Sequence, residues 1–142
     1  MQITRREEYG LRGLVFLAQQ PGEKVCLVSE ISRVQKIPEK FLGKIFQRLS
    51  KAGLLRSIRG SKGGFSLRKP AAEITMLEVI ETLEGPIAIN RCLLRKGECD
   101  EEEGCPLYDI WEETQQNLLK VLDRTTIEDL VKRISNGKRG GR

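Results

Sequence analysis

The sequence predicts a mainly α-helical protein with a small β wing, built as a winged helix-turn-helix domain followed by a long helix. Three observations lead to this fold class. Two helical segments separated by a tight link lie within 29–52, a glycine-rich hairpin follows directly at 54–68, and an apolar seam at coiled-coil spacing lies within 107–122. The length of 142 residues suits one domain, or a small domain with a helical extension.

The first helix is expected from about Arg5 to Gln19. Thr4 and Glu7 form a capping-box pattern at its start, apolar residues follow at helical spacing, and Pro21 stops it. Cys26 lies in the short apolar run that comes next, and its simplest interpretation is a small buried core residue.

A helix-turn-helix is predicted next. Ser29 is expected to cap a short helix at about 30–35, and Pro38 to open a third helix that ends at Ala52, before a left-handed Gly53. The third helix has an apolar face made of Leu42, Ile45, Phe46 and Leu49. Its outward stripe carries Lys40, Lys44, Gln47 and Lys51. An ordinary helical hairpin with a solvated lysine face is the alternative.

A hairpin completes the winged helix. Two short strands are expected at 54–59 and 65–68, joined by a glycine-rich turn at 60–64. A wing tip that reaches phosphates or a minor groove needs small residues for close approach and one long cation to insert. Arg59 is the best candidate for that cation, and Lys62 lies in the same turn.

Three further helices are expected. Thr75 and Glu78 form a second capping box, Pro106 opens a long helix to about 124, and Thr126 caps a last helix through Ile134. The long helix carries an apolar seam of Leu107, Trp111, Thr114, Leu118 and Val121, widened by Ile110 and Leu122. The seam favours a homodimer, with a bundle inside one chain as the alternative.

Three parts of the chain are therefore expected: the winged helix-turn-helix domain at 1–74, a cysteine loop with dimerisation helices at 75–135, and a mobile basic tail at 136–142.

Three cysteines mark the loop before the long helix. Cys92, Cys99 and Cys105 have the spacing C-x6-C-x5-C, and four carboxylates occupy 100–103. This spacing differs from the C-x2-4-C pairs of zinc fingers, and nothing indicates a secreted disulfide framework. Three unrelated buried thiols would prefer apolar neighbours, so a metal or iron–sulfur site is favoured. Cys105 directly precedes Pro106, where a helix start would stabilise a thiolate.

Charge is divided unevenly along the chain. Residues 1–70 carry 15 Lys and Arg against 5 Asp and Glu, a net of +10, whereas residues 71–142 carry 10 against 15, a net of −5. The asymmetry predicts nucleic acid as the partner of the first half, with a merely solvated basic face as the alternative. The absence of histidine excludes His-dependent metal sites and catalytic triads, so we expect no enzyme. No apolar run is long enough to span a membrane, which favours a cytoplasmic protein.

Together these features resemble the Rrf-type family of bacterial winged-helix transcriptional regulators, and in particular its iron–sulfur-binding branch, over nearly the whole chain. The resemblance rests on Tyr9-Gly-Leu-Arg, Pro38-Glu-Lys-Phe-Leu, Leu49-x-x-Ala-Gly-Leu-Leu, Arg59-Gly-Ser-Lys-Gly-Gly-Phe-Ser-Leu, and the three cysteines followed by Leu107-Tyr-Asp-Ile-Trp. It implies a homodimer that binds palindromic double-stranded DNA. It also implies that an iron–sulfur cluster, 2Fe–2S or 4Fe–4S, switches DNA affinity in response to redox state, nitric oxide or iron–sulfur status.

The same resemblance implies site residues. The cluster ligands would be Cys92, Cys99 and Cys105, and Glu8 occupies the place of an acidic ligand that part of the family takes from the first helix. Another part of the family has a histidine ligand and an operator-tuning glutamate where this chain has Tyr108 and Gly43. The candidate DNA contacts are Ser29, Pro38, Glu39, Lys40, Phe41, Lys44, Arg59, Ser61 and Lys62. The third helix would enter the major groove and Arg59 the minor groove.

A cluster-free regulator of the same fold, controlled by zinc, a thiol switch or a protein partner, is the alternative function. A constitutive DNA-packaging protein would explain the charge asymmetry but leaves the three cysteines unexplained.

Overall fold

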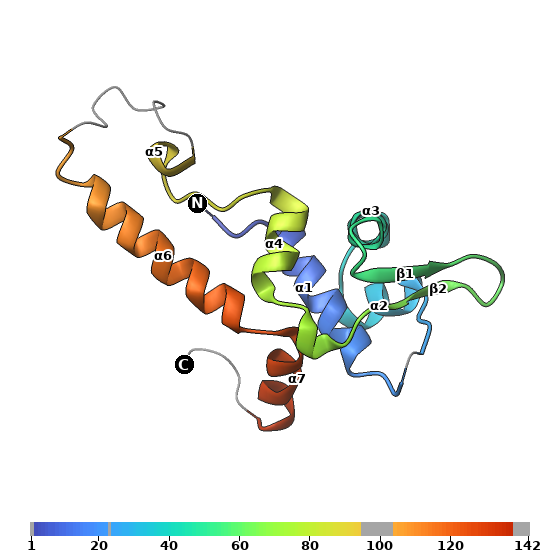
Figure 1. The fold of residues 1–142 in the computed structure, drawn as a ribbon. Helices are drawn as coiled ribbons and strands as arrows, with labels where there is room; N and C mark the ends of the chain where they lie inside the picture. Colours follow the sequence, from blue (N-terminus) through green and yellow to red (C-terminus); the bar gives the residue numbers. More distant parts are fainter. Residues whose placement is uncertain (1, 23, 95–103, 138–142) are drawn as a thin grey trace.

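The computed structural model describes residues 2–22, 24–94 and 104–137 (Figure 1). Its elements in chain order are α1 (Arg5–Ala18), α2 (Val28–Gln35), α3 (Glu39–Lys51), β1 (Leu55–Ile58), β2 (Gly64–Leu67), a 3-10 turn η1 (Ala71–Glu73), α4 (Met76–Glu84), α5 (Arg91–Leu94), α6 (Tyr108–Arg124) and α7 (Ile127–Ser135). This architecture confirms the predicted fold class, a mainly helical protein with one small antiparallel hairpin.

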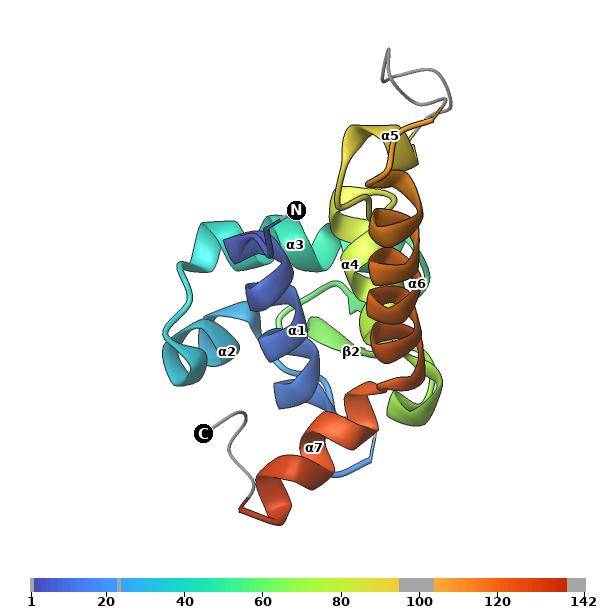
Figure 2. The ribbon, with the colours of Figure 1, turned by 90° about the vertical axis from the view of Figure 1, so that its left-hand side faces the viewer.

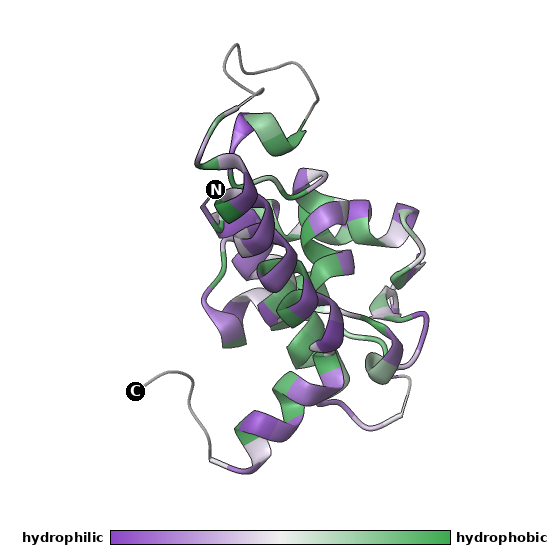
Figure 3. Ribbon diagram, turned by 60° about the vertical axis from the view of Figure 1, so that its left-hand side comes forward, coloured by the Kyte–Doolittle hydropathy of each residue, from purple (hydrophilic) through white to green (hydrophobic). Residues whose placement is uncertain are grey.

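Helix α1 is the centre of the core and contacts α2, α3, α4, α7 and β2. Two glycines allow its close packing, because a Cβ on Gly13 would lie 2.6 Å from the ring of Phe46, and a Cβ on Gly10 would lie 2.7 Å from Leu83. The apolar face predicted for α3 is buried here: Leu42, Ile45, Phe46 and Leu49 are each at most 3% exposed. Hydrophobic residues accordingly gather between the helices, whereas the side of α6 turned to the viewer in Figure 3 is mostly hydrophilic.

Side-chain caps define several helix starts. The capping boxes of α1, from Thr4 and Glu7, and of α7, from Thr126 and Asp129, are both formed. The box predicted for α4 is only half formed. Thr75 accepts a hydrogen bond from the backbone of Glu78, but the Glu78 carboxylate accepts bonds from Lys69 Nζ at 2.8 and 3.0 Å.

Three predicted helix starts are wrong by one or two residues. Leu27 is the N-cap of α2, and Ser29 lies inside the first turn without capping it. Pro38 is the N-cap of α3, which starts at Glu39. Helix α6 starts at Tyr108, two residues after Pro106, so Cys105 does not adjoin its first turn as predicted.

The hairpin is held to the rest of the domain by Cys26. Strands β1 and β2 pair in antiparallel register from Leu55 opposite Leu67 to Ile58 opposite Gly64. The backbone of Cys26 exchanges two hydrogen bonds with Phe65, and its side chain is fully buried, as predicted. Gly64 is required at this crossing, because its φ is +146° and a Cβ there would lie 2.3 Å from the Cys26 carbonyl oxygen.

The last two helices return the chain to the core. Helix α6 contacts α4, and α7 packs against α1 and η1. In both views α6 runs from its junction with α7 toward α5 (Figures 1 and 2). The backbone N–H of Met76 donates to Thr125, and that of Ile127 donates to Ile74, each at 2.9 Å. Within the described ranges, no helix combines the length and apolarity needed to cross a bilayer.

Candidate functional site

The outer face of α3 is cationic because its apolar face is used by the core. Lys40, Lys44, Gln47 and Lys51 are all exposed, as predicted. No carboxylate in the part of the chain that the structure describes forms an ion pair with Lys40 or Lys44. Unpaired ammonium groups on one helix face give a positive potential that attracts phosphate backbones.

The link between α2 and α3 is fixed by side chains that bind its carbonyl groups. Lys36 takes a left-handed conformation with φ +56°, which turns the chain from one helix to the other. Ser32 Oγ donates to the carbonyl of Ile37, and Arg12 Nη2 donates to the carbonyl of Gln35. These bonds satisfy the carbonyl of the last residue of α2 and one carbonyl of the link, and they fix the direction in which α3 leaves the turn.

An aromatic and cationic stack holds the start of α3 against α1. The rings of Tyr9 and Phe41 meet edge to face with centroids 5.7 Å apart. The Arg12 guanidinium lies 5.9 Å from the centroid of Tyr9. Phe41, a candidate DNA contact, is 39% exposed and is therefore held on one side by Tyr9 and open to solvent on the other.

The remaining candidate DNA contacts are also accessible. Ser29, Pro38, Glu39, Arg59, Ser61 and Lys62 are all exposed. The last three lie at or within the turn that projects beyond β1 and β2 in Figure 1. Exposure is a requirement for DNA contact, and the assignment of each residue to a groove or a phosphate stays a prediction.

Two of the three predicted cluster ligands lie at one end of the molecule. Cys92 is on α5 and Cys105 precedes α6, both half-buried, and α5 packs against α6 (Figure 1). Cys99 and the carboxylates at 100–103 lie outside the described residues. Among those that are described, no three His, Cys, Asp or Glu side chains are grouped as a metal site. Thiolates are the usual ligands of iron–sulfur clusters, so Cys92 and Cys105 have the chemistry that such a group requires, and the role of Cys99 stays a prediction.

Glu8 is separate from this pair of cysteines in the chain's own fold. It lies in the first turn of α1, with its side chain 49% exposed, and its Oε2 is 3.5 Å from Arg5 Nη1. It therefore does not complete a metal site with Cys92 and Cys105 of the same chain.

The neighbouring Glu7 was not recognised from the sequence as a buried acid. Its side chain is 3% exposed, and burial raises the pKa of its carboxyl, opposed by the hydrogen bond from the Thr4 backbone and assisted by the charge of Glu84. Glu84 also accepts a hydrogen bond from Thr4 Oγ1 at 2.9 Å and lies 3.6 Å from Arg6 Nη1. No local pattern indicates this cluster, because it forms between residues about 80 positions apart.

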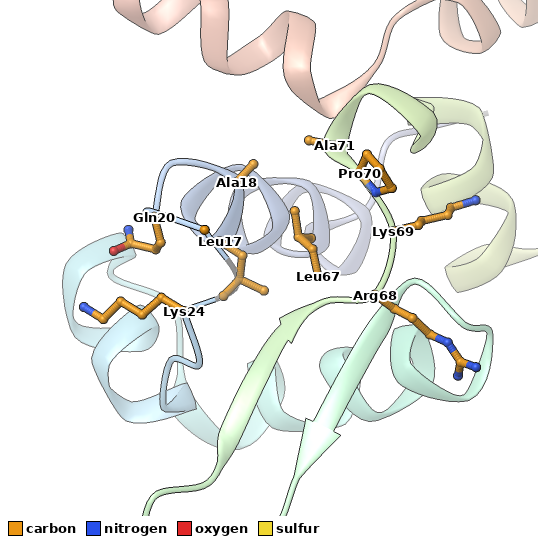
Figure 4. Close-up of a pocket in the computed structure, with 10 residues that line it drawn as sticks. Leu17, Ala18, Gln20, Lys24, Leu67, Arg68, Lys69, Pro70 and Ala71 are labelled. Atoms are coloured by element: carbon orange, nitrogen blue, oxygen red, sulfur yellow. The ribbon is translucent and has the colours of Figure 1, made fainter.

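A cavity of about 380 Å³ lies away from α3, between the end of α1 and the chain that leaves β2 (Figure 4). It is lined by Leu17, Ala18, Gln20, Gly22, Lys24, Leu67, Arg68, Lys69, Pro70 and Ala71. None of these lining residues is an acid, a histidine or a cysteine. The described wall of the cavity therefore lacks the carboxylates, imidazoles and thiols that most often act as acids, bases and nucleophiles.

The sequence model of the Rrf2 family, described as "Iron-dependent Transcriptional regulator", matches residues 3–133. The chain belongs to the Rrf2 family. "Protein aau3" of Rhizobium meliloti is 37% identical over 138 residues, which cover 93% of this chain and 86% of that protein.

The solved structures of two regulators superpose on most of this chain. CymR, the global cysteine regulator of B. subtilis, has a TM-score of 0.81 and 32% identity, with 93% of this chain and 97% of CymR covered. IscR of T. potens has a TM-score of 0.76 and 25% identity, with 100% and 94% covered. The protein is a transcriptional regulator of the Rrf2 family and not an enzyme.

Proposed function

We propose that this Rrf2 protein is a homodimer that binds palindromic DNA through α3 and the hairpin and is controlled at its cysteine segment. The observation that carries the proposal is the outer face of α3, where Lys40 and Lys44 are exposed and unpaired while the opposite face is buried. Helix α3 would enter the major groove, and Arg59 at the wing would enter the minor groove.

The apolar seam of α6 supports the dimer. Three of its residues, Leu107, Ile110 and Val121, are 53%, 55% and 46% exposed, whereas Leu122 is buried against the chain's own core. Exposed large apolar residues along one helix are typical of an interaction surface. A second copy would cover this surface and place the two α3 helices over half-sites about 34 Å apart, or a multiple of that distance.

A cluster bound by Cys92, Cys99 and Cys105 is the regulator that best fits the donor set. Three thiolates and one further ligand would hold a 2Fe–2S or 4Fe–4S cluster, and the cluster would supply redox chemistry and reactivity toward nitric oxide. Glu8 is the candidate fourth ligand, contributed to the partner's cysteine segment. Its carboxylate is exposed and is paired only with Arg5 among the described residues, an ion pair that costs little to break.

A cluster-free regulator is the second candidate, and the similarity to CymR favours it. Zinc, a thiol switch or a protein partner would then act at the same cysteines. Tyr108 supports this alternative, because an unperturbed phenol has a pKa of about 10 and is a poor metal ligand at neutral pH.

Purification without oxygen distinguishes the two candidates. A brown protein with acid-labile sulfide supports the cluster, and a colourless protein with stoichiometric zinc, or with no metal, supports the alternative. Cys99→Ala should abolish the cluster, while Cys26→Ala, which removes the buried core thiol, should retain it. Glu8→Ala should leave a cluster with altered absorption and faster reaction with oxidant. An unchanged spectrum and reactivity would exclude Glu8 as a ligand.

DNA binding is tested separately, on the protein as purified without oxygen. Loss of a phosphate contact in Lys40→Ala or Lys44→Ala should weaken binding equally on all sequences. Loss of a base contact should relax specificity at one position by about 1–3 kcal/mol. Ile110→Glu should give monomers and lose the preference for palindromes. A wild-type chain that is monomeric at micromolar concentration and indifferent to palindromes would contradict the proposal.

A further inference from the structure

A second, smaller cavity lies between α1 and α3. Its volume is about 220 Å³, and it is lined by Arg6, Phe41, Lys44, Ile45 and Arg48. Three of these five residues are cations from two different helices. The cavity is therefore lined by two apolar and three cationic residues.

The packing of α1 explains why these cations meet. Gly10 has no side chain, so α1 lies close to α3 and α4, with the position of its Cβ 3.4 Å from Ile45 and 2.7 Å from Leu83. Arg6 lies one turn before Gly10 and therefore comes beside α3 at the same level. Lys44 and Arg48 are four residues apart and share one stripe of α3.

The positive charges of this cavity are only partly compensated. Lys44 and Arg48 are like charges at i and i+4, an arrangement that disfavours a helix. Neither has an ion-pair partner among the residues that the structure describes. Arg6 is paired with Glu84, 3.6 Å away, and its side chain remains 43% exposed. Two positive charges thus face one small cavity without a counter-ion, which is the condition for binding an anion.

We propose that Arg6, Lys44 and Arg48 form a subsite for one phosphate of the DNA backbone, and that Glu84 weakens this subsite by holding Arg6. The inference rests on the proposed DNA-binding function, because α3 carries both the base-reading face and two of the three cations. A guanidinium matches the geometry of phosphate oxygens, so Arg6 and Arg48 suit this ligand better than lysines would.

Glu84 connects the subsite to the cysteine segment. It is the last residue of α4, and the chain runs from there to Cys92 on α5. Its carboxylate accepts a hydrogen bond from Thr4 Oγ1 as well as pairing with Arg6, so it ties the start of α1 to the end of α4. A displacement of the end of α4 would change how firmly Arg6 is held and hence how well the subsite binds phosphate.

The salt dependence of DNA affinity tests the subsite. Each phosphate contact adds about 0.9 to the slope of log K against log salt. Because Arg6, Lys44 and Arg48 share one phosphate, Arg6→Gln and Arg48→Gln should each reduce the magnitude of the slope by up to that amount, and Arg6→Lys should retain most of it. Arg133→Gln, an exposed change on α7, is the matched control and should leave the slope unchanged.

Glu84→Gln tests the restraint. It keeps an oxygen that can accept the hydrogen bond from Thr4 Oγ1 but removes the negative charge that pairs with Arg6, so affinity at low salt should rise several-fold. The rise should disappear in the double variant Arg6→Gln/Glu84→Gln. A rise that persists in the double variant would overturn the role of Glu84.

The remaining outcomes separate this inference from the proposed function. Unchanged slopes in Arg6→Gln and Arg48→Gln, with salt-dependent binding by the wild type, would overturn the subsite alone. Wild-type protein without salt-dependent DNA binding would overturn the proposed function. Binding of inorganic phosphate that Arg6→Gln abolishes, with no change in the DNA slope, would identify a free-anion site and overturn the assignment to DNA.

Discussion

Gly13→Ala should destabilise the fold, although alanine is the better helix former. The glycine lies in α1, where an added Cβ would be 2.6 Å from Phe46 Cε1 and 2.7 Å from Cζ. Carbon atoms in contact prefer about 3.5–4.0 Å, so the ring or the helix would have to move by roughly 1 Å. Phe46 is fully buried, and its ring already meets that of Phe65 edge to face at 5.3 Å, which leaves it little freedom.

Two opposing free energies set the size of the effect. Overpacking of a filled core costs about 1–3 kcal/mol, and the fixed position of Phe46 favours the upper half of that range. Replacing glycine by alanine within a helix returns about 1 kcal/mol. The net destabilisation should therefore be about 1–2 kcal/mol.

Gly43→Ala is the matched control. This glycine lies in α3, and a Cβ there would meet nothing within 4 Å. Only the helix propensity applies, so Gly43→Ala should stabilise by up to about 1 kcal/mol. With a urea slope of about 1–3 kcal/mol/M, the midpoints of the two variants should differ by on the order of 1 M at equal protomer concentration. Stabilisation by both variants to the same degree would refute the packing argument.

Three other changes have defined outcomes. Burial raises the pKa of Glu7, so the folded state binds a proton more readily than the unfolded chain. The stability that this proton contributes is fully present below the ordinary glutamate pKa of 4.5. It is lost as the pH rises through the pKa that Glu7 has in the folded state. Glu7→Gln should therefore be more stable than wild type near neutral pH, with a difference in urea midpoint that shrinks on acidification; a difference independent of pH would contradict this. Thr126→Ala removes the cap of α7 and should cost about 0.5–2 kcal/mol in the same assay, whereas Thr126→Ser should cost far less. Arg59→Ala should lower DNA affinity most on sites with A·T-rich flanks, and equal losses on G·C-rich flanks would make Arg59 a plain phosphate contact.

Local signals predicted most of the fold. The cap at Thr4, the buried stripe of α3 and the wing all depend on residues close in sequence, and each is present in the structure. Ser29 does not cap α2 because the helix begins before it. Leu27 is the N-cap, and Ser29 is already the second residue of the helix. Pro38 and Pro106 were placed too far into their helices for a similar reason, since proline tolerates several positions near a helix start.

The parts of the site that depend on distant contacts were not visible in the sequence. The exposed lysines of α3 were predicted because helical periodicity places them opposite the core. The contribution of Arg6 to the cavity beside α3, by contrast, depends on how closely α1 crosses α3. Gly10 permits a close crossing, but a glycine in the sequence does not by itself indicate one. Glu84 could not be recognised from the sequence either, because its partners Thr4 and Arg6 lie about 80 residues earlier in the chain.

The backbone bonds at Thr125 and Ile127 have a mechanical consequence. These hydrogen bonds fix the chain at the C-terminal end of α6, whereas the N-terminal end of that helix lies near α5 and follows Cys105. A helix of 17 residues is about 25 Å long, so a tilt of about 5° around this fixed base displaces the far end by about 2 Å. A rotation of α6 about its junction with α7 would therefore move the end near Cys105 furthest. Helix α7, on the other side of this junction, packs against α1, the helix that carries both Arg6 and Arg12.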